Sequence, residues 1–546
     1  MATAGQLIVD TLAAHRIDRV FCVPGESYLG LLDPLFGRAD VDTVVCRHEA
    51  GAGFMALADA RMTGRPGVAM VSRGPGASNA SIAVHTAQQD GVPFILFIGQ
   101  VAARDVRRDS FQEIDYGHMF GKIAKWTVEV TDPNRMPETM LRAIQVATTG
   151  VPGPVVIAIP EDVLTAECDG ATVMPQARPT AVPDASSIVL LRELLTSAKR
   201  PLVLAGSGID SAEARAMLLT FLEAWNVPSV VSFRRQDLLP NKHPLYAGDL
   251  GLSNPATQMD VLRDCDLLLN IGARFSDITT QGYTYPQLVR PEMKLAHIHA
   301  DPAAIGTHSD IAIACHPTLA IAAVGKPDRS LPDRSDWIGR LSKERTKISS
   351  VRTFDVSDGV PFEDVVDVVG QHLPGDAIVT VDAGTFGAPI YRVIPFKPPQ
   401  RLLAPISGAM GFGVPAAVAA GLRQPDRTVV CFVGDGGFLM TGSELAVALE
   451  RKLPLKVIVS ENNIYGSIRI HQERGYPGRI VGTSFVNPDL ELIGKAYGCA
   501  VTRISTRAEV NRIPDLLRAP GPQFIVVDTS IQAIISRPGN VREAIE

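Results

Sequence analysis

Val433-Gly434-Asp435-Gly436-Gly437-Phe438 and Ser460-Glu461-Asn462-Asn463-Ile464-Tyr465-Gly466 each close an apolar run typical of a buried strand, 427–433 and 455–460. The segment 442–449 between them has the periodicity of a helix. This order predicts a βαβ unit, and its right-handed crossover makes the two strands parallel. Asp435 and Asn462 are 27 residues apart. We expect them at one carboxyl edge, where open α/β sheets bind ligands.

The two segments contain groups that bind a divalent cation and an anion. A carboxylate and an amide oxygen suit a hard cation, and Mg²⁺ is bound by few protein ligands together with phosphate oxygens. Glycines have no Cβ, so the backbone N–H groups of Gly436 and Gly437 can approach an anion closely. The sequence therefore predicts a site for Mg²⁺ and a phosphate group at this edge.

Length and composition describe a globular protein of several domains. The chain has 546 residues, of which 46% are hydrophobic and 20% charged. About 150 residues per domain would give three or four domains. A net charge of -6 and the lack of a long Lys/Arg cluster argue against nucleic acid or an anionic membrane as a partner. We expect an enzyme that acts on small molecules.

The cysteines and the N-terminal segment bear on the compartment. The seven cysteines include no C-x-x-C pair, which predicts buried thiols in a reducing environment. Charged residues interrupt Met1 to Phe21 before a continuous apolar core forms, so the segment is interpreted as an amphipathic first helix and not as a targeting sequence. No window of 18 uninterrupted apolar residues is present. We expect a soluble, cytoplasmic protein.

Short apolar runs alternate with helix-length segments along the whole chain. Nearly all-apolar strands are typical of parallel sheets that helices cover on both faces. The predicted strands are 43–46, 67–72, 94–99, 155–160, 201–206, 228–233, 266–272, 295–300, 377–382, 428–434, 455–460 and 524–528. Two Pro-containing stretches, 165–183 and 325–336, have the composition of linkers. The predicted fold class is α/β, with three doubly wound parallel-sheet domains at 1–165, 185–325 and 358–546.

Four further segments add a family resemblance. They are Arg47-His48-Glu49-Ala50-Gly51-Ala52, Ser72-Arg73-Gly74-Pro75-Gly76-Ala77-Ser78-Asn79, Ser110-Phe111-Gln112-Glu113 and Gly408-Ala409-Met410-Gly411-Phe412-Gly413. Together with the first two motifs, they resemble thiamine diphosphate enzymes of the acetohydroxyacid synthase and pyruvate oxidase group, in the same order and over nearly the whole chain. The resemblance implies a pyrimidine-binding domain, a central domain and a diphosphate-binding domain. It also implies a cofactor held between the first domain of one subunit and the third of another, so a homodimer is the minimal unit and a homotetramer is expected.

The same resemblance suggests the metal ligands. They are Asp435, Asn462 and the backbone carbonyl of Ile464. In the family, the second of two asparagines binds the metal, whereas this chain has Glu461-Asn462-Asn463. Asn462 keeps Tyr465-Gly466 aligned with the aromatic-Gly pair of relatives, and Asn463 is the alternative.

The diphosphate carries more negative charge than one Mg²⁺ neutralises, so backbone N–H groups are expected to contribute. The loops 436–438 and 382–386 each follow a predicted strand and suit this role, although 382–386 could also be a simple strand-to-helix turn. The expected cofactor contacts are Asp382, Gly384, Thr385, Phe386, Gly408, Met410, Gly434, Asp435, Gly436, Gly437, Phe438, Asn462, Ile464, Tyr465 and Gly466.

Three residues receive catalytic roles from the resemblance. Glu49 would exchange a proton with the aminopyrimidine ring of the cofactor, which in turn removes the proton from C2. Met410 would support the bend between the two cofactor rings, and Gln112 would face the reacting carbonyl. Without the family context, these would be a helix-start carboxylate, a core methionine and a loop hydrogen-bonding residue.

Some relatives bind FAD in the central domain. Here Gly206-Ser207-Gly208 is an incomplete dinucleotide fingerprint, and Arg274-Phe275-Ser276-Asp277 only partly resembles the flavin-contacting segment of those relatives. The sequence favours a central domain without FAD.

The expected substrate pocket departs from that of acetohydroxyacid synthases. His471 stands at about the place where those enzymes carry a Trp, and Gly25, Glu26 and Ser27 stand where they carry small residues. Polar groups in place of an aromatic wall predict ligation or cleavage on a substrate other than two pyruvates.

The leading hypothesis is a thiamine diphosphate and Mg²⁺ dependent enzyme that decarboxylates a 2-oxo acid and passes the resulting carbanion to a second carbonyl. The alternatives are a simple 2-oxo acid decarboxylase, a flavin-linked oxidase and a carbon-carbon hydrolase. One alternative is not an enzyme: a catalytically silent regulatory subunit. Against it argues the joint presence of the proposed catalytic and metal-binding residues Glu49, Met410, Asp435 and Asn462.

Overall fold

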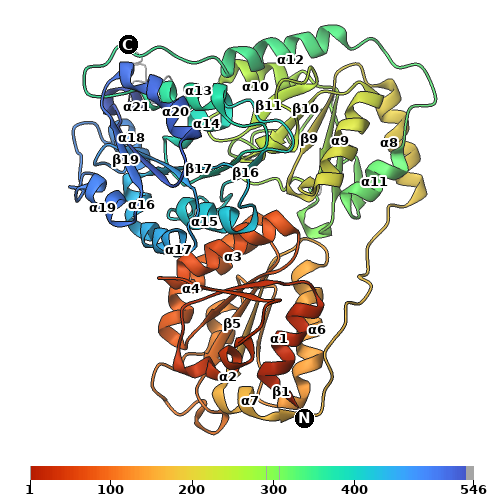
Figure 1. Ribbon diagram of the computed structural model, residues 1–546. Coiled ribbons are helices and arrows are strands. Elements are labelled where there is room, and N and C mark those ends of the chain that lie inside the picture. Colours follow the sequence, from red (N-terminus) through yellow and green to blue (C-terminus); the bar gives the residue numbers. More distant parts are fainter. Residues whose placement is uncertain (1, 291, 307, 536–546) are drawn as a thin grey trace.

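The chain forms three α/β domains, each built on a six-stranded sheet (Figure 1). The structure is a computed structural model that describes residues 2–290, 292–306 and 308–535. Every strand pairing in the three large sheets of the described chain is parallel. The predicted fold class is confirmed. The outer limits of the predicted domains, 1 and 546, lie outside the described residues.

The first sheet has helices on both faces. Its strands run in the order β3 (Asp42–Val45), β2 (Arg19–Cys22), β4 (Gly67–Val71), β5 (Phe94–Gln100), β7 (Pro154–Pro160) and β6 (Trp126–Glu129). Alternate side chains of β5 enter two different cores, Ile95 and Phe97 on one face and Leu96 and Ile98 on the other. The first core is closed by α1 (Ala4–Ala14) and α6 (Met136–Thr148), and the second by α3 (Glu49–Thr63) and α4 (Gly74–Asp90).

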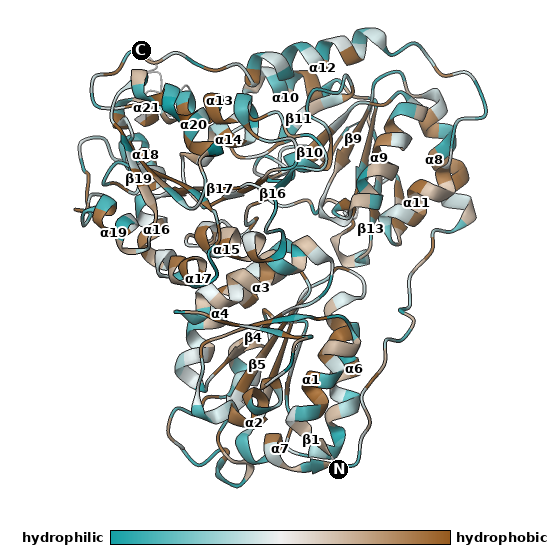
Figure 2. Cartoon of the chain, viewed as in Figure 1, coloured by the Kyte–Doolittle hydropathy of each residue, from teal (hydrophilic) through white to brown (hydrophobic). Residues whose placement is uncertain are grey.

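The central sheet repeats this layering. Its order is β11 (Tyr246–Leu250), β10 (Ser229–Ser232), β9 (Pro201–Ala205), β12 (Leu267–Ile271), β13 (Lys294–His299) and β14 (Ile311–Ala314). One face packs on α8 (Ala185–Ser197), α9 (Ala212–Trp225) and α11 (Pro317–Val324), and the other on α10 (Ala256–Arg263) and α12 (Ser335–Ile348). In Figure 2 strands inside the sheets, such as β4, β5 and β17, are largely brown and so hydrophobic, which fits strands covered on both sides.

The third sheet carries the two motifs with which the sequence analysis began. Its order is β16 (Arg401–Leu403), β15 (Ile378–Val381), β17 (Val429–Gly434), β18 (Lys456–Glu461), β20 (Gln523–Asp528) and β19 (Ala500–Ile504). One face packs on α13 (Phe362–His372), α14 (Gly387–Val393) and α20 (Ile513–Arg518). The other packs on α15 (Gly413–Arg423), α17 (Leu445–Glu450) and α19 (Leu490–Ala496).

The first and third domains share one core. The apolar cluster on α3 and α4 continues into α15 and α17, and the rings of Phe54 and Phe412 meet edge to face at a centroid distance of 5.6 Å. Figure 1 shows α3 on top of the first domain, directly below α15. The two domains therefore meet through packed helices.

The predicted βαβ unit is present. β17 and β18 are parallel neighbours, with Gly434 opposite Ser460. The helical segment starts earlier than expected, because α16 (Asp435–Thr441) begins at the motif itself and is followed by the short 3-10 helix η8 (Gly442–Glu444) and α17.

The predicted first helix is too long. α1 ends at Ala14, and residues 19–22 form β2 inside the first sheet. The chain reverses at Arg16, whose φ of 58° is left-handed, and the N–H of Ile17 donates back to the carbonyl of Leu12. The strand escaped prediction because it has four residues and starts with a charged one.

Two further expectations concern segments outside the sheets. The stretch 165–183 begins at the last residue of α7 (Glu161–Thr165) and contains a two-residue strand, β8 (Glu167–Cys168), paired antiparallel with β1 (Ala2–Thr3). Its other residues lack regular structure. All helices in the described part of the chain are too short or too polar to cross a lipid bilayer.

Candidate active site

Asp435 and Asn462 meet at the carboxyl edge of the third sheet. Asp435 is buried, and its Oδ2 accepts hydrogen bonds from the backbone N–H groups of Asn462 at 2.9 Å and Asn463 at 2.7 Å. Its Oδ1 accepts the N–H of Gly436 at 2.8 Å. The parallel strands thus bring a carboxylate and the Asn-rich turn together, as the sequence predicts.

The two candidate asparagines differ in their surroundings. The Oδ1 of Asn462 accepts the N–H of Ile464 at 3.1 Å, so this side chain stays within the turn. Asn463 has a left-handed φ of 59°, and its Oδ1 accepts the N–H of Asn487 at 3.2 Å. The side chain of Asn463 is thereby occupied with the neighbouring loop.

Asn487 is a member of this site that the sequence analysis missed. Its Nδ2 donates to Asp435 Oδ2 at 3.0 Å and to Glu461 Oε1 at 3.3 Å. Its Oδ1 is buried and has no hydrogen-bond partner within the described residues. The residue lies 52 positions beyond Asp435 on an irregular segment, so no strand periodicity pointed to it.

The two predicted phosphate-binding loops pack against each other. A Cβ placed on Gly434 would lie 3.1 Å from the ring of Phe386, and one on Gly437 would lie 3.0 Å from Asp382 Oδ1. A Cβ on Gly436 would lie 2.7 Å from the ring of Tyr465 and 3.6 Å from the terminal methyl of Met410. The glycines are therefore required for the close approach of these loops.

Asp382 lies beneath this surface and organises it. Its side chain is fully buried and accepts the N–H groups of Ala383 at 2.7 Å, Gly411 at 2.9 Å and Gly413 at 2.8 Å. Burial raises the pKa of the Asp382 carboxyl to about 6, against the opposing effect of these three N–H groups. The cofactor contact at Asp382 stays a prediction, and the Asp382 carboxylate holds the loop that carries Met410.

Glu49 occupies the first turn of α3 in the first domain. Its Oε2 accepts a hydrogen bond from Asn79 Nδ2 at 2.9 Å, and a Cβ on Gly76 would lie 3.4 Å from its Oε1. Two motifs that are 30 residues apart therefore meet at this carboxylate. Asn79 is the contact that sequence reasoning left unassigned.

Gln112 lies on the loop that follows β5. Its φ is 63°, and its backbone carbonyl accepts the N–H of Gly74 at 2.8 Å. The side chain of Gln112 is exposed, and the hydrogen-bond partner of Glu49 among the described residues is Asn79. The backbone of the loop is thus fixed to the start of α4.

The predicted substrate residues fall on two domains. Gly25 packs against Ser72, because a Cβ there would lie 2.5 Å from the Cβ of Ser72; Glu26 is exposed and Ser27 is buried. His471 is exposed on α18 (Gly466–Gly475) of the third domain. No hydrogen bond between the described residues joins the two groups within one chain.

Three segments of the chain, one in each domain, match domain families of known proteins. Residues 2–119 match the N-terminal TPP binding domain of thiamine pyrophosphate enzymes, residues 189–324 match the central domain, and residues 382–527 match the C-terminal TPP binding domain. The chain belongs to the thiamine pyrophosphate enzymes. All the predicted site residues of this family member lie inside the two matches described as TPP binding.

Curated relatives of this thiamine pyrophosphate enzyme extend over most of its length. The acetolactate synthase large subunit of Lactococcus lactis is 31% identical over 91% of this chain and 87% of its own length. That of Corynebacterium glutamicum is 30% identical over 96% of this chain and 86% of its own. The acetolactate synthase isozyme 1 large subunit of Escherichia coli is 31% identical, with 96% and 93% covered.

The donor set fits the thiamine pyrophosphate enzyme family. The side-chain oxygens at this edge of the sheet belong to the Asp435 carboxylate, to neutral amides and to the Glu461 carboxylate, which is paired with Arg503 at 2.8 Å. Hard oxygen donors of this kind suit Mg²⁺ better than a softer metal. Across the described residues there is no cluster of three or more His, Cys, Asp or Glu side chains that could hold a metal without help from other groups. A metal bound here would therefore depend on backbone and cofactor oxygens.

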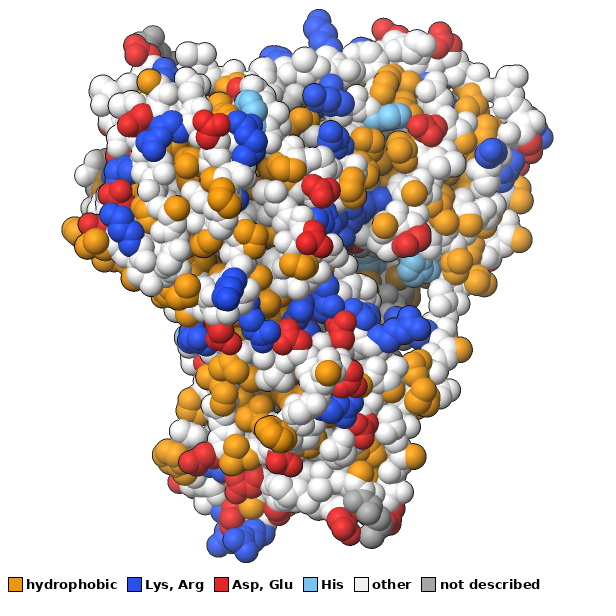
Figure 3. Space-filling model, viewed as in Figure 1, with side chains coloured by type: hydrophobic (Ala, Val, Ile, Leu, Met, Phe, Trp, Pro, Cys, Tyr) orange, Lys and Arg blue, Asp and Glu red, His pale blue; other side chains and the backbone are white. Residues whose placement is uncertain are grey.

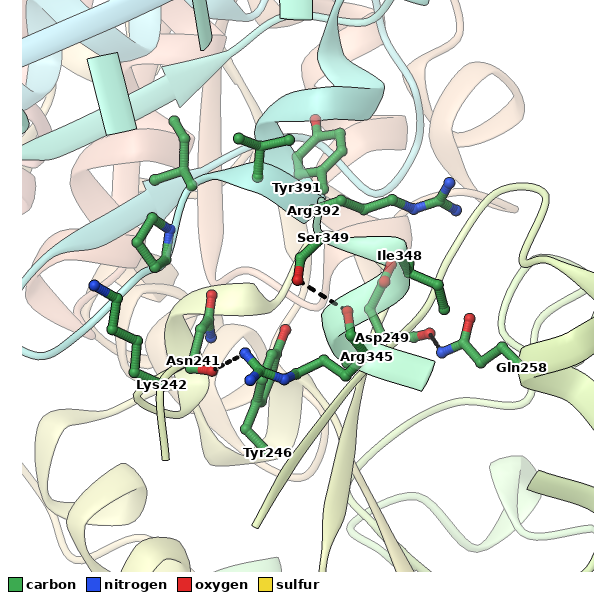
Figure 4. A pocket seen from close by; sticks show the side chains of 14 residues that line it. Asn241, Lys242, Tyr246, Asp249, Gln258, Arg345, Ile348, Ser349, Tyr391 and Arg392 are labelled. Atoms are coloured by element: carbon green, nitrogen blue, oxygen red, sulfur yellow. Dashed lines mark hydrogen bonds between the residues drawn. The ribbon is translucent and has the colours of Figure 1, made fainter. Parts of the chain in front are cut away.

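A separate cavity of about 280 Å³ lies between the central and third domains (Figure 4). Arg345 extends from α12 across it to the carbonyl of Asn241 at 2.8 Å, and Arg392 comes from α14. Burial raises the pKa of the Asp249 carboxyl at its side. Both arginines stand in the last turn of their helices, where cations interact favourably with the helix dipole. The lining includes none of the predicted site residues.

Proposed function

We propose that the chain is a thiamine diphosphate and Mg²⁺ dependent enzyme that decarboxylates a 2-oxo acid and joins the remaining acyl group to a second carbonyl compound. The observation that carries this proposal is the meeting of Asp435 with the Asn462 turn at one sheet edge. It stands in a chain whose relatives, over more than nine tenths of its length, are acetolactate synthase large subunits.

Asp435, Asn462 and the carbonyl of Ile464 are the proposed Mg²⁺ ligands. Asn462 is favoured over Asn463 because it keeps Tyr465-Gly466 aligned with the aromatic-Gly pair of relatives. Each of the two amide oxygens accepts one backbone N–H, so the hydrogen bonds do not separate the two residues. The N–H groups of the loop residues 384–386 and 437–438 would bind the diphosphate, because those of Ala383 and Gly436 donate to the carboxylates of Asp382 and Asp435. These loops are in contact, so one diphosphate can reach both.

When bound, the cofactor supplies a carbon nucleophile and an electron sink for decarboxylation. The chain's own residues orient it and manage one proton. Glu49 holds or releases that proton at the ring nitrogen far from the reacting carbon, while Asn79 fixes its Oε2. Met410, beside Gly436, supports the bend between the two rings.

A homodimer is the proposed minimal unit, and a homotetramer the proposed full assembly. Glu49 and Gln112 lie on the first domain and the metal-binding loop on the third, which suits a cofactor shared between two chains. Apolar side chains are exposed on both domains, as the orange atoms of Figure 3 show. Those on α4, α16 and α17 are Ile82, Leu439, Met440 and Leu449.

Three further parts of the proposal follow from the chain itself. We place the enzyme in the cytoplasm, because all seven cysteines are free thiols. We propose a central domain without FAD, since Arg274 donates to Gln89 at 2.8 Å and the ring of Phe275 lies against that of His297 at a tilt of 52°. We propose an acceptor other than pyruvate, because exposed Glu26 and His471 would bring polar groups to the pocket.

The test is a screen of 2-oxo acids with and without aldehyde or ketone acceptors, each with and without thiamine diphosphate and Mg²⁺. Ligated product that requires both cofactors is expected, and Asp435→Ala should abolish Mg²⁺-dependent cofactor binding in calorimetry. Full cofactor affinity in that variant would remove the metal assignment. Carbon dioxide release without ligated product would make the chain a simple decarboxylase.

A further inference from the structure

Glu444 is a buried carboxylate of the third domain that reaches into the first. It ends η8, directly after the motif helix α16, and its side chain is fully buried. Both of its oxygens accept the backbone N–H of Arg47 at 3.1 Å, and Oε1 also accepts the N–H of His48 at 2.9 Å. These are the two residues that precede Glu49.

The start of α3 offers both hydrogen-bond donors and space for the Glu444 carboxylate. The first N–H groups of a helix lack partners inside the helix. In α3, His48 Nδ1 accepts the N–H of Ala50 at 3.1 Å, and Glu444 takes the N–H groups just before it. A Cβ on Gly51 would lie 2.2 Å from Glu444 Oε1, so only glycine leaves room for the carboxylate. The 3-10 helix η8, the turn 47–48 and the first turn of α3 therefore meet at the Glu444 side chain.

The charges around Glu444 are few. Burial raises the pKa of the Glu444 carboxyl to about 7, and the N–H groups and the Arg47 side chain oppose this rise. The negative charge of Glu49 adds to the rise, so the two carboxylates interact. The remaining titratable neighbour is the buried thiol of Cys46, whose pKa is raised well above the usual value, mainly by burial and further by Glu444.

We propose that Glu444 is the positioning residue for Glu49, holding the turn 47–48 from the third domain so that the catalytic carboxylate keeps its place relative to the cofactor. The proposal rests on the function proposed above, in which Glu49 acts on the aminopyrimidine. Among the described residues, Glu444 is the only side chain of the third domain that accepts the backbone N–H groups of Arg47 and His48.

The experiment compares Glu444→Ala, Glu444→Gln and the control Glu450→Gln. Glu450 also contacts Arg47, but at the surface and through the side chain at 3.4 Å. The first readout is amide hydrogen exchange of the peptide containing Arg47 and His48 in the cofactor-free protein. The second is the rate of C2 hydrogen-deuterium exchange of bound thiamine diphosphate, with cofactor affinity measured in parallel.

In Glu444→Ala we expect faster amide exchange at the turn and C2 exchange slowed on the order of 10- to 100-fold, with nearly unchanged cofactor affinity. Glu444→Gln keeps one acceptor oxygen and should lie between Glu444→Ala and wild type in both readouts. Glu450→Gln should match wild type. If Glu444→Ala does not fold, Glu444→Gln decides alone.

Two results would overturn the proposal. One is unchanged amide protection at the turn in a folded Glu444 variant. The other is lost protection with wild-type C2 exchange, which would make Glu444 a structural residue only. A wild-type protein that fails to bind thiamine diphosphate with Mg²⁺ would instead refute the proposed function, and the amide exchange of the turn would still report on the Glu444 contact.

Discussion

At Asp435 one carboxylate serves four hydrogen-bond donors, three of them backbone N–H groups and the fourth the amide of Asn487. A carboxylate offers about four lone-pair sites, so these donors occupy its capacity. Asn487 is the only side-chain donor among them. The metal ion proposed above would replace the Asn487 donor at Asp435 and leave the three backbone N–H groups in place.

The choice between Asn462 and Asn463 can be tested at this scale. Asn462→Ala should lower Mg²⁺-dependent cofactor affinity, because it removes a proposed ligand. Asn463→Gly suits the left-handed backbone at that position and removes only the amide, so near wild-type affinity is expected. Calorimetric titration of thiamine diphosphate at several Mg²⁺ concentrations measures both. The reverse order of affinities would move the ligand to Asn463.

Glu49→Gln tests the proton role. The glutamine keeps the size of the side chain and can still contact Asn79, but it cannot exchange a proton. Cofactor should bind, while C2 hydrogen-deuterium exchange slows by about 10²- to 10⁴-fold, the range of general acid-base catalysis. An unchanged exchange rate would leave Glu49 as a helix-start residue without a catalytic part.

The strands that lead into the two motifs could be predicted from the sequence. Short strands with charged residues, and side chains that act across long sequence separations, could not. β17 and β18 are uniform apolar runs that end in Gly or polar residues, so both the strands and the meeting of Asp435 with Asn462 followed from the sequence. β2 and β11 are short and contain charged residues, which hides them in a hydropathy pattern. Glu444 and Asn487 act across long sequence separations, for which a single sequence holds no signal.

The raised pKa of Glu444 predicts how the unfolding free energy depends on pH. Glu444 has a folded-state pKa of about 7, above its usual value of 4.5. Because the pKa of Glu444 is higher in the folded state, the folded protein binds the proton more tightly than the unfolded chain does. The protonated Glu444 therefore stabilises the fold fully below about pH 4.5, and this contribution to the unfolding free energy is lost as the pH rises through 7. The loss is on the order of 3 kcal/mol.

Chemical denaturation between pH 5 and 8 measures this effect as the difference between wild type and Glu444→Gln, because other carboxylates contribute equally to both. The unfolding free energy of wild type should fall relative to the variant across this range. Parallel curves would show that Glu444 does not change its protonation between the folded and unfolded states there.

At the scale of the whole molecule, the first and third domains share a continuous core, while the proposed catalytic and metal-binding groups are divided between them. The sequence resemblance implied the assembly of the site from two chains, but no pattern within one chain could show which surfaces meet. The exposed apolar residues of α4 and α16 became visible only in the folded structure.

The central claim is that one active site combines Glu49 of one chain with Asp435 of another. The direct measurement uses a hybrid of Glu49→Gln and Asp435→Ala chains, coexpressed with different affinity tags and purified through both. One of the two sites in each hybrid dimer would then hold both intact residues, so we predict cofactor-dependent activity of about half the wild-type value per dimer, with each parent variant nearly inactive. A hybrid no more active than its parents would contradict the claim.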